Sequence, residues 1–161
     1  GLFFDIKAGK KALLVTSIRT ASCPGAVATR VLIYTCKGSS QSHESNAEHW
    51  TLLCTADDLS LPIADVKNVT NISNHEEHYG ELPLEEPLFI DKGVTMGFCV
   101  MSNSASGIAV REGIGIHAGK PSSGDEHMQI MAGLLITAPR LFHDVPKVSA
   151  AFVGSIQYHL Q

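Results

Sequence analysis

The sequence predicts an all-β fold, a two-sheet antiparallel β-sandwich of jelly-roll type with about eight to ten strands. Two observations lead to this prediction. Strand-like segments open and close the sequence at 1–8 and 151–158, each with a glycine next to or between aromatic residues. Between them lie short runs of branched and aromatic residues separated by polar loops, and no long helical pattern interrupts them.

The composition fits one globular domain spanning 1–161. The chain has 161 residues, of which 44% are hydrophobic and 17% charged, enough to bury a core. A net charge of −4 argues against a nucleic-acid partner, since such modules carry a basic surface. No apolar run approaches the ~20 residues needed to span a bilayer, so we expect no membrane insertion. Because the sequence begins within a strand and without Met, we expect a domain excised from a larger protein.

The first strands are predicted from alternation and residue type. Segment 2–8 places Phe4 and Ile6 on one face and Phe3 and Asp5 on the opposite face. Segment 12–19 is rich in branched residues, which favour strands. Segment 29–36 is the clearest strand, and both its faces are largely apolar, which indicates a central position between two layers. These segments therefore form the predicted centre of the fold.

The middle of the chain is less regular. Segment 49–55 alternates Trp50, Leu52 and Cys54, and the only Trp is predicted to anchor the core. Residues 56–86 show no clear pattern. A short edge strand is predicted at 88–90.

The last third returns to strand patterns. Segment 94–101 contains Gly97, which we expect at a bulge or at a close approach of two backbones. A polar loop is predicted at 117–126. The remaining strands are predicted at 108–111, at 127–132 with 134–137 either continuing it or pairing anew after Gly133, and at 150–159.

The cysteine spacing argues against metal and redox motifs. None of the four cysteines belongs to a CxxC pair, so zinc knuckles and thioredoxin-type sites are not expected. A domain of this size folds without staples, which favours free thiols; the alternative is two disulfides, in any of three pairings. Cys23, in a Ser-Cys-Pro-Gly turn, is predicted to be the most exposed. The others are Cys36, Cys54 and Cys99.

Several packing patterns occur in a fixed order, beginning with Gly-x-x-Phe-Asp-Ile-x-Ala at 1–8 and ending with Phe-x-Gly-x-Ile-x-Tyr at 152–158. This order resembles a β-sandwich module of multidomain secreted or surface proteins of microbes and algae. The resemblance implies an extracellular or cell-surface location and a role in adhesion or ligand binding. More distantly, the chain resembles the PHR-type recognition domain of ubiquitin ligases, which implies a cytoplasmic location and a protein partner.

Three polar clusters are candidate metal sites, although each also reads as a solvated loop. His75-Glu-Glu-His78 separates its two imidazoles by three residues, whereas the zinc-protease motif requires four. Carboxylates suit Ca²⁺, and imidazole with carboxylate suits Zn²⁺. We predict no resident cofactor, and these two metals are the ones that the donor types would fit. The other two clusters are Asp57, Asp58 and Asp65, and His117, Asp125, Glu126 and His127.

The irregular stretch also carries two glycosylation sequons, at Asn68 and Asn71, which predict an exposed surface if the protein is secreted. Aromatic residues could supply a sugar-stacking platform. Tyr79 is the one aromatic residue that clearly lies outside a predicted strand.

We predict a non-catalytic binding or interaction module that presents loops 37–48, 56–80 and 117–126 to a protein or glycan partner. No Gly-x-Ser-x-Gly elbow or comparable catalytic context is present. The alternatives are a metal-assisted carbohydrate-binding module and an intracellular substrate-recognition domain of a ubiquitin ligase. A homo-oligomer could form through an exposed edge strand. The candidate ligand-binding residues are Tyr79, His75, His78, Asp125 and His127.

Overall fold

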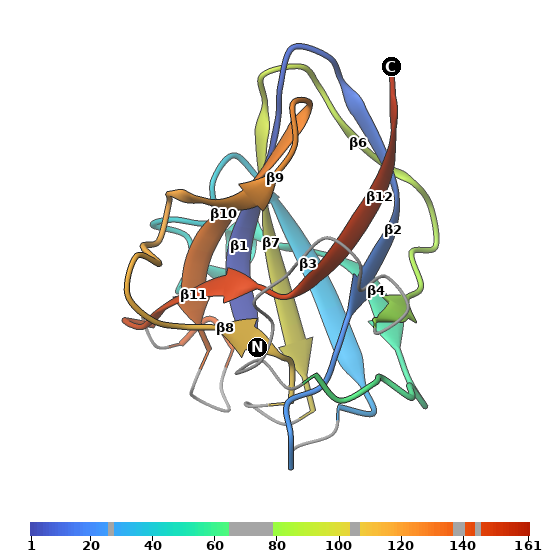
Figure 1. The fold of residues 1–161 in the computed structure, drawn as a ribbon, viewed down its shortest axis with the longest axis vertical. Coiled ribbons are helices and arrows are strands. Elements are labelled where there is room, and N and C mark those ends of the chain that lie inside the picture. The colour runs from blue at the N-terminus through green and yellow to red at the C-terminus, as the bar shows by residue number, and fades with distance from the viewer. Residues whose placement is uncertain (26–27, 65–78, 104–106, 137–140, 144–145) are drawn as a thin grey trace.

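The computed structural model describes residues 1–25, 28–64, 79–103, 107–136, 141–143 and 146–161. In this part of the chain twelve strands form two antiparallel sheets that pack into a β-sandwich (Figure 1). The predicted all-β sandwich is confirmed, while its jelly-roll connectivity stays a prediction. The strands are β1 (Leu2–Ala8), β2 (Leu13–Thr20), β3 (Val31–Lys37), β4 (Thr51–Ala56), β5 (Gly80–Leu82), β6 (Leu88–Ile90), β7 (Thr95–Ser102), β8 (Val110–Arg111), β9 (Pro121–Gly124), β10 (Met128–Leu135), β11 (Ser149–Phe152) and β12 (Gly154–Leu160).

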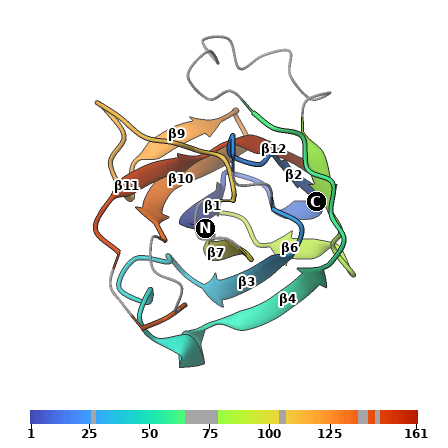
Figure 2. The same ribbon diagram turned by 90° about the horizontal axis from the view of Figure 1, so that it is seen from below.

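The two sheets differ in size. The large sheet has the order β4-β3-β7-β1-β10-β11-β8, with β9 also paired to β10. The small sheet has the order β12-β2-β5, with β6 also paired to β2. Figure 2 shows β3 and β4 on the opposite side of the molecule from β2 and β12, with β1 and β7 between them. No helix in the described part of the chain is both long and apolar enough to cross a membrane.

Alternation along β1 supplies side chains to two separate cores. Phe4 points between the sheets, where its ring stacks on Phe98 at 5.4 Å and on Phe152 at 4.7 Å. Phe3 points to the outer face of the large sheet, where a second cluster includes Trp50 and Phe142. The predicted faces of this strand are therefore confirmed, and the large sheet is covered on both sides.

The single strand predicted at 150–159 is wrong. The segment forms β11, which pairs with β10 and β8, and β12, which pairs with β2 in the other sheet. A Cβ at Gly154 would lie 2.0 Å from the carbonyl oxygen of Arg19 and 2.6 Å from the ring of Phe152. The chain thus changes sheets at a point where only glycine fits, and an unbroken apolar pattern hides the change.

The alternation of Trp50, Leu52 and Cys54 predicted for segment 49–55 is also wrong. Trp50 lies in the outer cluster, Cys54 lies in the main core, and Leu52 is 49% exposed. A register shift in the β3–β4 pairing, between Ile33 and Tyr34, breaks the alternation. Trp50 is nevertheless buried, as predicted.

Two strands were not predicted. β5 lies in the stretch that showed no pattern, and β9 lies inside the loop predicted at 117–126. Both are short, and β9 begins with Pro121 and ends with Gly124, residues that normally mark loops. The structure therefore has more strands than the eight to ten expected.

Other predictions hold. Gly97 is a close approach, since a Cβ there would lie 2.5 Å from the Sγ of Cys36 and 2.8 Å from the backbone N of Ser40. The four cysteines, all in the described part of the chain, are unpaired thiols. Cys23 is half-buried and the other three are buried, which agrees with the favoured prediction.

Candidate functional site

The turn between β9 and β10 is built around the carboxylate of Asp125. Its Oδ1 accepts hydrogen bonds from the backbone N–H of His127 at 2.8 Å and of Met128 at 2.9 Å. Gly124, at φ +140°, makes the tight entry, because a Cβ there would lie 2.2 Å from the carbonyl oxygen of Met128. A Gly-Asp pair followed by a polar residue is a local signal for such a turn.

The second oxygen of Asp125 connects the two sheets. Its Oδ2 accepts a 2.7 Å hydrogen bond from the hydroxyl of Tyr158, which belongs to β12. Desolvation opposes ionisation of Asp125, but the bonds from Tyr158 and the two backbone N–H groups prevail and lower its pKa. Burial, reinforced by the bond to Asp125, raises the pKa of Tyr158 to about 12. The pair therefore stays a phenol donating to a carboxylate over a wide pH range.

Backbone hydrogen bonds join this turn to the turns that follow β1 and β6. The N–H of Gly9 donates to the carbonyl of His127 at 2.7 Å, and the N–H of Gly93 donates to the carbonyl of Gly9 at 2.8 Å. The three turns lie together at the top of Figure 1. They form one hydrogen-bonded rim, so the β9–β10 turn is held from both sheets and from its neighbours.

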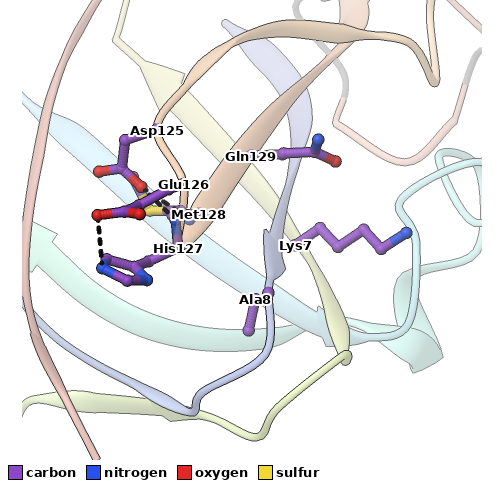
Figure 3. Close-up of a pocket in the computed structure, with 8 residues that line it drawn as sticks. Lys7, Ala8, Asp125, Glu126, His127, Met128 and Gln129 are labelled. Atoms are coloured by element: carbon purple, nitrogen blue, oxygen red, sulfur yellow. Dashed lines mark hydrogen bonds and ion pairs between the residues drawn. The ribbon is translucent and has the colours of Figure 1, made fainter.

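A shallow depression of about 160 Å³ lies beside this turn, lined by Lys7, Ala8, Gly9 and residues 125–129. Figure 3 shows Asp125, Glu126 and His127 grouped on one side, with Lys7 and Gln129 extending away from them. The Nε2 of His127 lies 3.3 Å from Oε1 of Glu126. The depression therefore has a charged wall and a polar edge.

A second depression of about 320 Å³ continues from the first. It is lined by residues 121–125 and by Gln129, so it shares Asp125 and Gln129 with the first. Gln129 pairs with Lys7 across β1 and β10, which places both on the same face of the large sheet. We call the two depressions together the polar groove.

The structure brings together some of the predicted site residues. Asp125, Glu126 and His127 lie in one turn, as their sequence proximity suggested. No group of three His, Cys, Asp or Glu side chains among the described residues is arranged to hold a metal ion, and His117 lines neither depression. Asp57 instead forms an exposed ion pair with Arg30 at 3.1 Å.

Other predicted residues do not contribute to the groove. Tyr79 packs beside a small apolar cluster that includes Val153, and burial raises the pKa of its phenol. It precedes Gly80, which pairs with Thr20 at the Gly154 end of β12, the end opposite Tyr158. His75, His78, Asn68, Asn71 and Asp65 lie outside the described residues.

The predicted recognition loop at 37–48 is partly buried. The carboxylate of Asp5, only 3% exposed, accepts hydrogen bonds from the hydroxyl of Ser39 and, at 2.7 Å, from the backbone N–H of Ser40. The indole N–H of Trp50 donates to the carbonyl of His43 at 2.8 Å. A short 3-10 turn, Ala47–His49, completes the segment. This loop is therefore fastened onto the outer face of the large sheet.

Three residues at the groove were not identified from the sequence: Lys7 and Gln129, which line it, and Tyr158, which does not line it but holds Asp125. Each lies in a strand pattern, where polar residues ordinarily face solvent. The partner of Tyr158 is 33 positions away along the chain, and no local spacing signals such a pair.

Comparison of the chain with protein-family models, with curated proteins and with solved structures finds no match. The resemblances to a surface β-sandwich module and to a PHR-type domain stay predictions.

Proposed function

We propose that the protein is a non-catalytic binding module that recognises a protein or glycan partner through the polar groove. The observation that carries this proposal is the continuity of two depressions that share Asp125 and Gln129. Hydrogen bonds from both sheets hold their common wall. A site that is ordered before binding loses less conformational entropy when a partner docks.

The shape and lining of the groove favour recognition over chemistry. Catalytic and small-molecule pockets are usually concave and bury most of the ligand, whereas this groove is shallow and open. Lysine, glutamine, glutamate and histidine side chains offer both hydrogen-bond donors and acceptors. Such a surface suits a polar partner that binds across it.

A carbohydrate ligand is the second candidate. The serines of β9 extend the polar lining, and adjacent donors and acceptors suit sugar hydroxyls. No aromatic residue lines either described depression, which favours a protein partner over a sugar that stacks on a ring. Metal assistance has no support among the described residues.

The state of the four cysteine thiols is relevant to the cellular compartment in which the protein is found. Four unpaired cysteines favour a reducing compartment and thus the cytoplasmic alternative, with an intracellular recognition domain as the corresponding role. A cell-surface location would be supported instead by glycans at Asn68 or Asn71. The intact mass of protein from its native source decides between them.

The test of the groove uses two matched double variants. Lys7→Ala/Gln129→Ala removes two exposed side chains from the groove, and Lys147→Ala/Gln157→Ala removes the same two residue types, also exposed, elsewhere. Both should fold as the wild type does. Partners captured on a glycan array and on a protein array should lose binding to the first variant and keep binding to the second. Equal loss in both, or none in the first, contradicts the proposed site.

A further inference from the structure

The outer face of the small sheet carries a second group of polar side chains, separate from the groove. Ile18 of β2 is fully buried in the core between the sheets, so its neighbours Ser17 and Arg19 face outward. Antiparallel pairing places Ser155 of β12 directly opposite Arg19. We call Ser17, Arg19 and Ser155 the outer patch.

All three residues of the outer patch have a buried polar atom without a partner. The hydroxyls of Ser17 and Ser155 and the Nε of Arg19 form no hydrogen bond within the described structure. Ser17 is only 4% exposed. Nearly all buried polar groups in folded proteins are paired, so three unpaired ones in adjacent positions require an explanation. A ligand that pairs with them supplies one.

The charge of the patch specifies the ligand. Arg19 forms no ion pair with any described residue, although Glu81 lies opposite it across β2 and β5. The Nε–H of arginine can only donate, and each serine hydroxyl can also donate. The patch therefore presents donors and a positive charge, which an acceptor-rich anion complements.

The spacing fits one small group. Side chains directly opposite across an antiparallel pair have Cβ atoms about 4.5–5.5 Å apart, and diagonal neighbours about 7–8 Å. Arg19 is opposite Ser155, and Ser17 is diagonal to Ser155. One oxyanion lying between them can accept from the guanidinium and from a hydroxyl. Because the Nε of Arg19 has no hydrogen-bond partner in the described part of the chain, pairing it with an anion breaks no hydrogen bond of that atom.

We propose that the outer patch binds a small oxyanion, a carboxylate or sulfate group, through Arg19 and the hydroxyls of Ser17 and Ser155. The site is on the opposite sheet from the polar groove and does not depend on the function proposed for it. The anion could be free in solution or carried on an acidic sugar, and both sources present the same chemistry to the patch.

Calorimetric titration with sodium sulfate, sodium acetate and sodium glucuronate, at ionic strength held constant with sodium chloride, tests the proposal. We expect saturable binding of at least one anion. Arg19→Gln should weaken it by about tenfold or more. Arg30→Gln, at an exposed arginine already paired with Asp57, should leave it unchanged. Tighter binding of glucuronate than of acetate would indicate a sugar-borne anion, and equal binding a free one. Absence of saturable binding for all three, or equal binding by Arg19→Gln, overturns the proposal.

The double variant Ser17→Ala/Ser155→Ala separates ligand binding from folding. Removing two hydroxyls that have no partner should leave the melting temperature without anion unchanged or higher. The same variant should bind the anion several-fold more weakly. A clear fall in melting temperature without anion would mean that the hydroxyls have structural partners, and it would overturn the proposal.

Discussion

Two aspartates fasten two loops on this protein, with opposite results. Asp5 is buried, and its two carboxylate oxygens accept hydrogen bonds from Ser39 and Ser40. These bonds hold the loop at 37–48, the closed loop, against the large sheet. Asp125 is exposed and uses its oxygens to hold the β9–β10 turn open beside the groove. The same interaction, a carboxylate accepting a hydrogen bond from a backbone N–H, holds the loop at 37–48 against the sheet and leaves the β9–β10 turn exposed beside the groove. The difference lies in what surrounds each aspartate, since an aromatic cluster lies beside only the first.

The largest expected effect comes from removing the buried aspartate. Asp5→Ala leaves the buried N–H of Ser40 and the hydroxyl of Ser39 without their acceptor, and we expect the free energy of unfolding to fall by about 2–4 kcal/mol. Chemical denaturation measures it. Asp5→Asn keeps one acceptor oxygen and should cost less. A loss below about 0.5 kcal/mol for Asp5→Ala would show that the carboxylate does not hold this loop.

The next largest effect on stability is expected from a substitution that displaces the closed loop, 37–48, from the large sheet. A Cβ at Gly97 would lie 2.5 Å from the Sγ of Cys36 and 2.8 Å from the N of Ser40, so Gly97→Ala forces the loop to shift and should cost about 1–3 kcal/mol. Alkylation of Cys36 should accelerate, while alkylation of Cys54, buried in the other core, should not. Burial raises the pKa of both thiols to about 11, so a selective change reports exposure. Equal acceleration at both would indicate general unfolding instead.

A smaller effect is expected at the open turn. Tyr158→Phe removes one hydrogen bond at a partly solvated site and should cost about 0.5–1 kcal/mol near neutral pH. The pKa of Tyr158 is raised from 10.0 to about 12 in the folded state. Its contribution is therefore complete below about pH 10 and is lost as the pH rises toward 12.

Asp125 determines how the stability of this pair depends on pH in the acid range. Its folded-state pKa is lowered from 3.8, so its contribution is present above that value and is lost as the pH falls below it. Denaturation at several pH values should show the Tyr158→Phe variant approaching the wild type at both extremes. A difference that does not vary with pH would mean that the two groups are not coupled.

The smallest effect on stability is expected at the displayed residues. His127→Ala removes a partly exposed imidazole and should change the free energy of unfolding by less than about 0.5 kcal/mol. Its backbone N–H still donates to Asp125, so the turn remains. Partner binding should weaken all the same, because the imidazole lines the groove. If His127→Ala lowered the free energy of unfolding as much as Asp5→Ala does, the imidazole would have a structural role, and the contrast between the open turn and the closed loop would be wrong.

Local alternation was sufficient to predict most of the fold. The two faces of β1 and the burial of Trp50 follow from short-range pattern. The split between β11 and β12 and the bulge in β4 do not, since both depend on which strand lies alongside. The site was predicted only in part. Asp125 and His127 lie in a turn with a local signal, whereas Tyr158 is bound to Asp125 through the packing of two sheets.

The measurement that tests the account most directly is a nuclear magnetic resonance titration of the labelled protein. The probes are neutral mono- and disaccharides and short polar peptides, and backbone shifts map where each one binds. The open turn and the groove should respond, with changes centred on the amides of His127 and Gln129, while the amide of Ser40 in the closed loop stays unchanged. Shift changes centred on the closed loop, with none at His127 or Gln129, would contradict the assignment of the groove as the recognition surface.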